Sequence, residues 1–245
     1  MNPFSLEDKT ILVTGATSGI GASTAIESAN AGARLVITGR NEERLNTTYS
    51  KLKGENHIKL VCDLNDEEQV KSLVSSLPKL DGAVLCAGVN QTMPITFLTR
   101  KKIDGMFNTN FFSPVELMRL IVKKKVLNEN ASIVTLSSIG GNEVFSPGAA
   151  AYGASKAALL SWMKTAAKEF APKYRVNCIC PGQVNTPMNA IGDITEEQYE
   201  IYRNSIPMKR FGEPEEIAYC AIYLLSDATR WVTGAAFTID GGTTL

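Results

Sequence analysis

The sequence predicts one α/β domain, built on a parallel sheet of about seven strands with helices on both faces. Short runs rich in Val, Ile and Leu are apolar throughout, which is typical of strands buried on both sides. Helical patterns separate these runs, as the crossovers between parallel strands require. The 245 residues are 44% hydrophobic, so a single domain spanning 1–245 can bury a large core.

Each element follows from its local pattern, and most apolar runs stop at Gly, Asp or Ser. The expected strands are 9–15, 34–39, 57–63, 80–88, 131–138, 174–182 and 235–242. Between them, the expected helices are 19–33, 41–53, 66–77, 99–126, 151–171 and 213–227. Gly32 is expected to end the first helix, and Asn65 to cap the third. The long irregular stretch from 183 to about 212 predicts a substrate lid.

Charge and composition exclude several classes of protein. Lys plus Arg and Asp plus Glu number 25 each, so the net charge is zero and nothing favours nucleic acid or a membrane surface as partner. No apolar run approaches the roughly 20 residues that cross a bilayer. The start, MNPFSLEDKT, lacks the pattern of a signal peptide. We therefore expect a cytoplasmic protein.

The five cysteines are expected to be reduced, because their number is odd and no export signal is seen. Cys178 and Cys180 would face the same side of a strand, and we interpret them as buried apolar side chains and not as metal ligands. The one histidine, His57, lies far from them in a polar stretch. No metal site is predicted, and a Ser-His-Asp or Cys-His catalytic set is disfavoured.

A glycine-rich turn follows the first expected strand. TGATSGIG places Gly15, Gly19 and Gly21 where a strand turns into a helix. Such glycines let the backbone approach a pyrophosphate, while the helix N-terminus offers free N–H groups and a partial positive charge. The turn predicts a dinucleotide site of the Rossmann-like kind, with an ordinary glycine-rich turn as the alternative.

The end of the second expected strand indicates which dinucleotide is bound. An acidic residue there would accept from a ribose 2′-hydroxyl, whereas this chain has Gly39 and Arg40. The guanidinium of Arg40 suits a 2′-phosphate, which favours NADP(H) over NAD(H). A solvated arginine at a helix start is the alternative. Asp63 could accept from an adenine amino group, or it could cap the next helix.

Tyr152 and Lys156 stand four residues apart in an apolar helical segment, AAAYGASKAALLSWM, so their side chains share one face. A phenol beside an ammonium can serve as a proton donor with a lowered pKa. The same spacing recurs at Tyr49 and Lys53, in what looks like an ordinary charged helix surface. The pattern alone does not separate chemistry from chance.

In their order and spacing, TGATSGIG at 14–21 and YGASK at 152–156 resemble the short-chain dehydrogenase/reductase family. The resemblance runs from about Lys9 to Gly242, and RFGEPEEIA and IDGG near the end also match. It implies a catalytic set of Asn110, Ser138, Tyr152 and Lys156. Tyr152 would exchange the proton, Ser138 would bind the substrate oxygen, and Asn110 would hold a relay water. Lys156 would bind the nicotinamide ribose and, with the oxidised nicotinamide, lower the pKa of Tyr152.

The cofactor site expected from the glycine turn and from this resemblance takes in residues from most strand ends. It comprises Gly15, Thr17, Ser18, Gly19, Ile20, Gly21, Arg40, Asp63, Leu64, Ala87, Gly88, Tyr152, Lys156, Pro181, Gly182, Val184 and Thr186. Two departures from the family pattern stand out. The family's Asn-Asn-Ala-Gly is Leu85-Cys86-Ala87-Gly88 here, so an asparagine that usually braces the sheet is missing. The loop from Ser138 to Tyr152 looks about one residue longer than in many members of the family, which touches the shape of the substrate site and makes Ser137 a poorer substitute for Ser138.

The resemblance implies an NADPH-dependent oxidoreductase that reduces a ketone to an alcohol. Length and chain ending look most like 3-oxoacyl-(acyl-carrier-protein) reductases of fatty acid biosynthesis. Sugar, steroid and small secondary-alcohol dehydrogenases of the family are the alternative. A non-enzymatic NADP(H)-binding sensor is the alternative from another class, although the intact catalytic set argues against it.

Contacts with substrate and partners are expected from position alone. The candidates for the pocket wall are Gln91, Met93, Phe145, Met188 and Asn189. An acyl carrier protein could dock on Lys123, Lys124, Lys125 and Lys173, although a solvated helix end is the competing interpretation. The apolar content of 99–126, 151–171 and the last strand favours a homotetramer.

Overall fold

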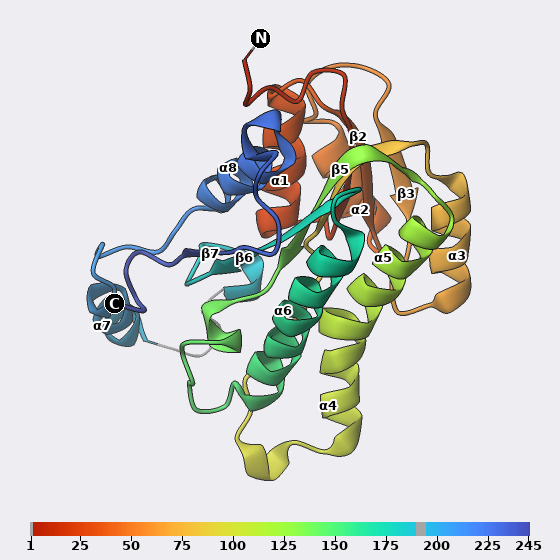
Figure 1. The fold of residues 1–245 in the computed structure, drawn as a ribbon. Coiled ribbons are helices and arrows are strands. Elements are labelled where there is room, and N and C mark those ends of the chain that lie inside the picture. Colours follow the sequence, from red (N-terminus) through yellow and green to blue (C-terminus); the bar gives the residue numbers. More distant parts are fainter. Residues whose placement is uncertain (1, 190–194) are drawn as a thin grey trace.

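Seven parallel strands form one sheet in the order β3-β2-β1-β4-β5-β6-β7. The computed structural model describes residues 2–189 and 195–245, and Figure 1 shows the sheet between two layers of helices. The strands are β1 (Thr10–Thr14), β2 (Arg34–Gly39), β3 (Ile58–Val61), β4 (Leu80–Leu85), β5 (Leu127–Leu136), β6 (Arg175–Pro181) and β7 (Ala236–Ile239). The fold class expected from the sequence is confirmed, although most strands are a few residues shorter than their apolar runs.

The helices cover both faces of the sheet because alternate strand residues are apolar in both directions. They are α1 (Gly19–Asn30), α2 (Glu42–Tyr49), α3 (Glu67–Ser76), α4 (Arg100–Phe107), α5 (Ser113–Lys123), α6 (Ala150–Phe170), α7 (Glu196–Ser205) and α8 (Pro214–Leu225). Side chains of α3, α5 and α6 pack on one face, and those of α1, α2 and α8 on the other. Among the described residues, no helix is both long and apolar enough to cross a membrane.

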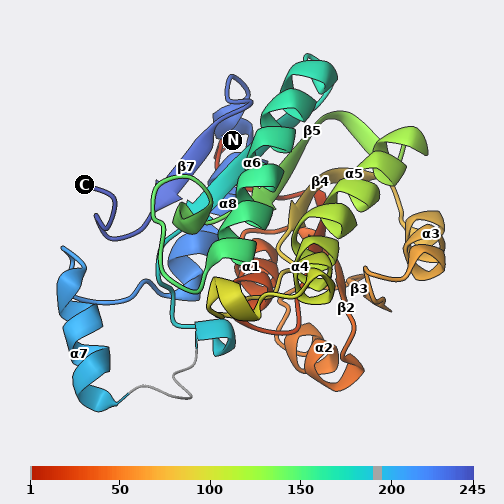
Figure 2. The same ribbon diagram turned by 90° about the horizontal axis from the view of Figure 1, so that it is seen from below.

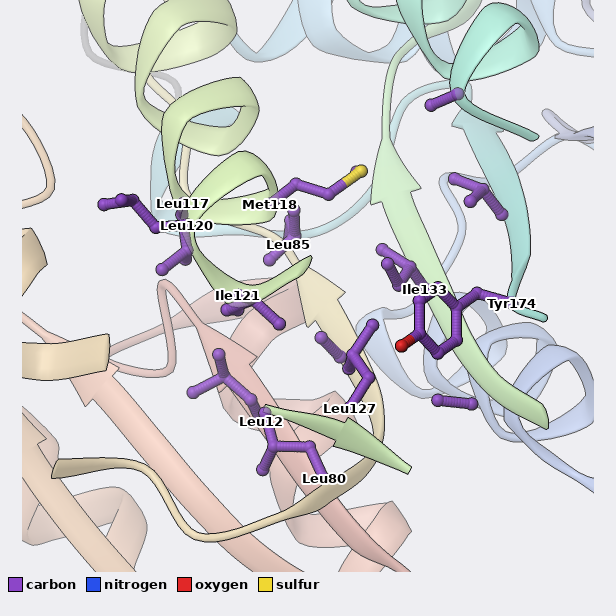
Figure 3. Close-up of a cluster of buried hydrophobic side chains, with 14 of the residues drawn as sticks. Leu12, Leu80, Leu85, Leu117, Met118, Leu120, Ile121, Leu127, Ile133 and Tyr174 are labelled. Atoms are coloured by element: carbon purple, nitrogen blue, oxygen red, sulfur yellow. The ribbon is translucent and has the colours of Figure 1, made fainter. Parts of the chain in front are cut away.

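Figure 3 shows the larger part of the core on the α5 side of the sheet. Leu12 and Ile133 point from the strands toward Met118 and Ile121 of α5, and all four are almost completely buried. Burying one such side chain contributes about 1.5–3 kcal/mol. Leu85, which stands where the family usually has asparagine, belongs to this core and is 2% exposed. The local packing at Leu85 is therefore apolar.

The strand order places a crevice at the carboxyl ends of β1 and β4. From β1 the chain moves outward through β2 to β3, and then returns to the other side of β1 to form β4. Helices that leave neighbouring strands in opposite directions leave an opening between them, which is where doubly wound sheets bind ligands. The loops after Thr14 and Leu85 therefore border the expected site.

The long helical region expected at about 99–126 is present from Arg100 to Lys123, but it is not one regular α-helix. Asn108–Phe112 form a π-helical turn between α4 and α5. The hydroxyl of Ser113 donates to the carbonyl oxygen of Asn108 over 2.8 Å, which satisfies one group of the widened turn. The hydroxyls of Thr109 and Ser113 also donate to the side-chain oxygen of Asn65.

Because the Asn65 side chain turns toward the π-helical turn, it does not cap α3 as expected. The carboxylate of Asp66 does so instead, accepting from the backbone N–H groups of Glu68 and Gln69 at 3.0 Å each. The stretch from 183 to 212 holds a short turn at Pro187–Asn189 and the helix α7, which stands away from the other helices in Figure 2. Residues 190–194 lie outside the described part, and the lid function stays a prediction.

Candidate active site

A cavity of about 630 Å³ opens at the carboxyl ends of the strands. Every residue expected to bind the cofactor lines it, and so do Ser138, Tyr152 and Lys156. Residues far apart in the sequence, such as Gly15 and Gly182, therefore border one space. Asn110 is the exception among the expected catalytic residues, because it is completely buried behind the wall.

The glycine turn between β1 and α1 fits a pyrophosphate. Gly15 and Gly19 have φ of +65° and +52°, a conformation that other residues rarely adopt. A Cβ on Gly15 would lie 2.9 Å from the Cα of Ala87, so the turn packs directly against the loop after β4. Ser18 precedes α1 without a side-chain capping bond, so no side chain occupies the N–H groups at the start of the helix. This end of the helix can receive an anion.

Two arginines line the part of the cavity beyond β2. Arg40 follows the strand, and Arg44 lies one turn later in α2. Both are exposed, and neither forms an ion pair within residues 2–189 and 195–245. Arg44 was missed in the sequence analysis, although its spacing of four from Arg40 was a usable signal.

Asp63 and Leu64 line the same part of the cavity at the end of β3. The carboxylate of Asp63 accepts from the backbone N–H of Asn65 over 3.0 Å and so holds the turn after the strand. The alternative that Asp63 caps the next helix is wrong, because Asp66 has that place.

Close packing of two glycines brings Ser138 to Tyr152. Ser138 follows β5, and Tyr152 lies in the first turn of α6. A Cβ on Gly153 would lie 2.5 Å from the carbonyl oxygen of Gly140, and one on Gly141 would lie 2.9 Å from the backbone nitrogen of Ala157. No larger residue fits this contact. The Ser138 hydroxyl accepts from the Gly140 N–H over 3.1 Å and hydrogen-bonds to the phenol of Tyr152.

Burial shifts the two titrating groups of α6 in opposite senses. Lys156 is buried, its Nζ donates to the carbonyl oxygen of Leu136 over 2.7 Å, and burial lowers its pKa to about 8. Burial raises the pKa of Tyr152, and the hydrogen bond from Ser138 opposes that rise. The Nζ of Lys156 lies 5.9 Å from the centre of the Tyr152 ring. The chain without a bound dinucleotide therefore does not have the lowered Tyr152 pKa that the resemblance implies.

Ser137 has a different task from Ser138. Its hydroxyl donates to the backbone carbonyl of Lys156 over 2.9 Å and is buried. It ties β5 to α6 beneath the site, which agrees with its being the poorer substitute for Ser138.

Asn110 holds the loop after β4 with its side chain. Its Oδ1 accepts from the N–H of Val89 over 2.8 Å, and its Nδ2 donates to the Val89 carbonyl over 2.9 Å and to the Ser155 hydroxyl over 3.0 Å. The hydroxyl of Thr14 accepts from the N–H of Ala87 over 3.2 Å. These bonds brace the loop in which the family's asparagine is missing.

The expected pocket wall is only partly brought together. Met188 lines the cavity, whereas Gln91, Met93 and Phe145 do not. Phe145 is 84% exposed, and the sulfur of Met93 accepts from the ammonium of Lys102. The side chain of Asn189 lies outside the described part. The sequence analysis missed several residues that line this end, namely Asn90, Thr92, Val144, Ser146, Gln183 and Tyr202.

The second Tyr-x-x-x-Lys pair lies away from the cavity. The hydroxyl of Tyr49 donates to the carbonyl oxygen of His57 over 2.9 Å, and neither Tyr49 nor Lys53 lines the site. The imidazole of His57 accepts from the N–H of Leu35 over 3.0 Å, which is a structural use of this ring. Cys178 and Cys180 are buried in β6.

The lysines considered for carrier docking lie at the other edge of the sheet. Lys123 ends α5, Lys124 and Lys125 lead into β5, and Lys173 precedes β6. In parallel strands this is the amino edge, whereas the cavity opens at the carboxyl edge. Carrier docking at these lysines stays a prediction.

Fold and site together define a dinucleotide-dependent oxidoreductase. The family model described as Enoyl-(Acyl carrier protein) reductase matches residues 15–244. The chain belongs to the short-chain dehydrogenase/reductase family. It is 33% identical to the 3-oxoacyl-(acyl-carrier-protein) reductase of Thermotoga maritima over 97% of this chain and 98% of the relative.

Other similar proteins have names that refer to other activities. A glucose 1-dehydrogenase of Gluconobacter oxydans is 32% identical over 97% of this chain and 92% of its own. Among solved structures, the RhlG/NADP active-site complex of Pseudomonas aeruginosa matches with a TM-score of 0.92 and 30% identity over 100% of both chains. The similarity therefore establishes the family and the oxidoreductase class, and leaves the substrate open.

Proposed function

We propose that the protein is a ketoreductase that uses NADPH to reduce a ketone to a secondary alcohol. The observation that supports this most is that Ser138, Tyr152 and Lys156 line the same cavity as the glycine turn at Gly15 and Arg40. A hydride donor held along the turn and a carbonyl held by the Ser138–Tyr152 pair would share this space. A 3-oxoacyl thioester is the leading substrate class, in keeping with the named reductase of Thermotoga maritima.

The residues present fit a nicotinamide dinucleotide, which supplies the hydride when bound. The free N–H groups at the start of α1 would hold its pyrophosphate. Gly88 keeps the wall close to Lys156, since a Cβ there would lie 3.4 Å from the Lys156 Nζ. Lys156 can thereby reach a ribose hydroxyl, as the family resemblance implies.

Tyr152 is suited to give up a proton during reduction. Because burial raises its pKa, the phenol keeps its proton near neutral pH until a substrate oxygen takes it. The phenolate left behind accepts a hydrogen bond from Ser138. The ammonium of Lys156, 5.9 Å from the centre of the Tyr152 ring, attracts its negative charge. Ser138 has one hydrogen to donate, so it bonds the substrate oxygen while negative charge develops there and the phenolate once the proton has moved.

Asn110 would act by position and not by direct contact. Its side-chain amide is fully engaged with Val89 and Ser155. A relay water held by Asn110, as the resemblance implies, would therefore have to use its backbone, which lies in the π-helical turn at Asn108–Phe112.

The preference for NADPH rests on Arg40 and Arg44. A 2′-phosphate beside them would meet two cations without ion-pair partners in the described residues. Charge-assisted contacts of this kind contribute roughly 1.5–3 kcal/mol each. The acidic first turn of α2, with Glu42 and Glu43, opposes this attraction, so we propose a preference and not an absolute requirement.

The leading function is tested by following NADPH oxidation with acetoacetyl thioesters and simple ketones, and NADP⁺ reduction with glucose and small secondary alcohols. A thioester preference supports the reductase assignment. Faster turnover of glucose would favour the sugar-dehydrogenase alternative, which the relative from Gluconobacter oxydans makes specific.

A further inference from the structure

Gln183 and Tyr202 form a polar pair in the wall of the cavity. Gln183 follows β6 directly after Gly182, and Tyr202 lies in α7. The Gln183 amide donates to the Tyr202 hydroxyl over 2.5 Å, and both residues line the cavity together with Ser138 and Tyr152. The pair therefore faces the space in which a ketone would react.

The backbone around the pair fixes its position. Gly212 donates to the carbonyl of Gln183 over 2.9 Å, and Asn185 donates to the carbonyl of Gly212 over 2.8 Å. Phe211, beside Gly212, is buried and meets the ring of Tyr202 at an angle of 62° with 5.6 Å between centroids. The Tyr202 ring thus rests on the segment that is hydrogen-bonded to Gln183.

The hydroxyl of Tyr202 has a hydrogen left to donate. Its oxygen accepts from Gln183, and within residues 2–189 and 195–245 it has no other hydrogen-bond partner. The side chain is 41% exposed. A hydroxyl whose oxygen already accepts a bond is a good donor to a carbonyl oxygen.

Among the described residues, the cations that line the cavity are Arg40 and Arg44 beyond β2 and Lys156, which is buried beside Tyr152 and bonded to the carbonyl of Leu136. The sequence contains no Lys, Arg or His in 86–98, 126–155 or 176–202. The next arginines along the chain are paired, Arg203 with Glu200 over 2.6 Å and Arg210 with Glu216 over 2.7 Å. A carboxylate brought to Tyr202 would lose part of its hydration without an unpaired cation in contact with Tyr202 among the described residues, which is unfavourable.

We propose that Tyr202, held by Gln183, donates a hydrogen bond to a second, uncharged oxygen of the substrate, such as the ester or thioester carbonyl of a 3-oxo compound. This inference rests on the proposed ketoreductase function. It makes Tyr202 a residue that selects esterified 3-oxo substrates over both simple ketones and free 3-oxo acids.

The test compares three substrates with NADPH in excess. Ethyl acetoacetate has the second carbonyl, 2-heptanone has a chain of the same length without it, and acetoacetate has a carboxylate in its place. The variant Tyr202→Phe removes the hydroxyl and keeps the ring that contacts Phe211. Gln183→Leu removes the partner of that hydroxyl. Tyr199→Phe is the matched control, because its ring also contacts Phe211 but does not line the cavity.

We expect Tyr202→Phe to raise the KM for ethyl acetoacetate about five- to tenfold, the range for one neutral hydrogen bond, with kcat little changed. The kinetics with 2-heptanone should not change. Gln183→Leu should produce a smaller loss with the same selectivity, and Tyr199→Phe no loss. For the unmutated enzyme, kcat/KM for acetoacetate should be at least about a hundredfold below that for its ester.

The inference is overturned if Tyr202→Phe affects the ester and 2-heptanone equally, or affects neither. Acetoacetate reduced as well as its ester would also overturn it. If Tyr152→Phe abolishes ketone reduction and Tyr202→Phe leaves it unchanged for every substrate, this inference alone is refuted. If the unmutated enzyme reduces no ketone, the proposed function fails as well.

Discussion

The side-chain amide of Asn110 forms a closed pair with the backbone of Val89, accepting from its N–H and donating to its carbonyl. This geometry copies a backbone pairing between strands, although the two residues are 21 apart. It fixes the loop after β4, whose Ala87 and Gly88 line the cavity. The amide that the family places among catalytic residues is, in this chain, a brace for the cofactor side of the site.

Removing the brace should cost stability. In Asn110→Ala, the partly buried N–H and carbonyl of Val89 lose their partner, so we expect the free energy of unfolding to fall by about 2–4 kcal/mol. Urea denaturation measures the change. Ser155→Ala is the control, since it removes one of the three contacts of Asn110 and should cost about 1 kcal/mol. If Asn110→Ala unfolds like the unmutated protein but has lost activity, Asn110 acts chemically.

Replacing the proton donor should affect turnover alone. We expect Tyr152→Phe to lower kcat on any accepted ketone by about a hundredfold or more, the range for a positioned acid. Binding of NADPH, followed by its fluorescence, should change little. Near-normal turnover would refute the assignment.

Tyr49→Phe provides the internal comparison for that experiment. It breaks the hydrogen bond to the His57 carbonyl, so it should lower stability by about 0.5–1.5 kcal/mol. Turnover should stay unchanged, because Tyr49 does not line the cavity.

The buried ammonium of Lys156 should make stability depend on pH. Its pKa is about 8 in the folded chain against 10.5 for the ordinary group. Below pH 8 the folded state must keep a buried charge, which destabilises it. This penalty fades as pH rises from about 8 to 10.5, since only the unfolded chain then still binds the proton.

Lys156→Met should therefore be more stable than the unmutated protein near pH 7, by about 1–3 kcal/mol, while losing activity. The difference should shrink toward pH 10, as urea denaturation across this range would reveal. A difference independent of pH would mean that the lysine is not buried as a charge.

Cofactor choice should follow the two arginines. We expect kcat/KM to favour NADPH over NADH by about ten- to a hundredfold, as one or two charge-assisted contacts imply. Arg40→Ala and Arg44→Ala should each weaken NADPH and leave NADH nearly unchanged. Both cofactors must be compared at one ionic strength. A higher kcat/KM with NADH would make Arg40 an ordinary surface charge.

Reversing the preference needs two substitutions. Gly39→Asp would supply a carboxylate for the ribose 2′-hydroxyl, but a Cβ at Gly39 would lie 2.5 Å from the Cγ2 of Thr17. Thr17→Ser removes that methyl group. We expect the double variant to prefer NADH, and Gly39→Asp alone to bind both cofactors poorly.

Assembly should cover an apolar surface near α4. Ile95, Phe97 and Phe112, which precede and follow α4, are 72%, 66% and 53% exposed, and exposed apolar side chains of this size are candidates for an interface. We propose a homotetramer with two-fold axes. Light scattering at micromolar concentration checks this, and a monomer of 26.5 kDa would contradict it. Ile95→Glu with Phe97→Glu should yield smaller species.

The parts of the site that could be predicted from the sequence are those whose geometry depends on residues close together in the chain. The turn from Gly15 to Gly21 and the Tyr152–Lys156 pair depend on residues close in sequence, so spacing was sufficient. Phe145 was misplaced because the direction of a side chain in a long loop depends on contacts that spacing does not contain. Tyr202 was missed because Phe211 and Gln183 bring it to the cavity from outside the motifs.

The π-helical turn between α4 and α5 was not predicted, for a related reason. Its causes are the contacts of Ser113 with Asn108 and of Asn65 with the turn. The apolar pattern of 99–126 is helical on both sides of it, and the local signal for the turn is Pro114, which lacks the N–H that the carbonyl of Asn110 would take in an α-helix. Hydrophobic spacing therefore could not locate it.

The π-helical turn at Asn108–Phe112 makes the length of this segment more important than its composition. A π-helical turn, with i→i+5 bonds, holds one residue more than an α-helical turn. Deleting one residue here would therefore allow a continuous α-helix in which α4 and α5 keep their faces, so Leu117 and Ile121 would stay in the core. Regularising the turn without a deletion would instead rotate α4 against α5 by about 100°. A deletion would thus spare the packing and change only the turn that carries Asn110, whose bonds to Val89 hold the loop after β4.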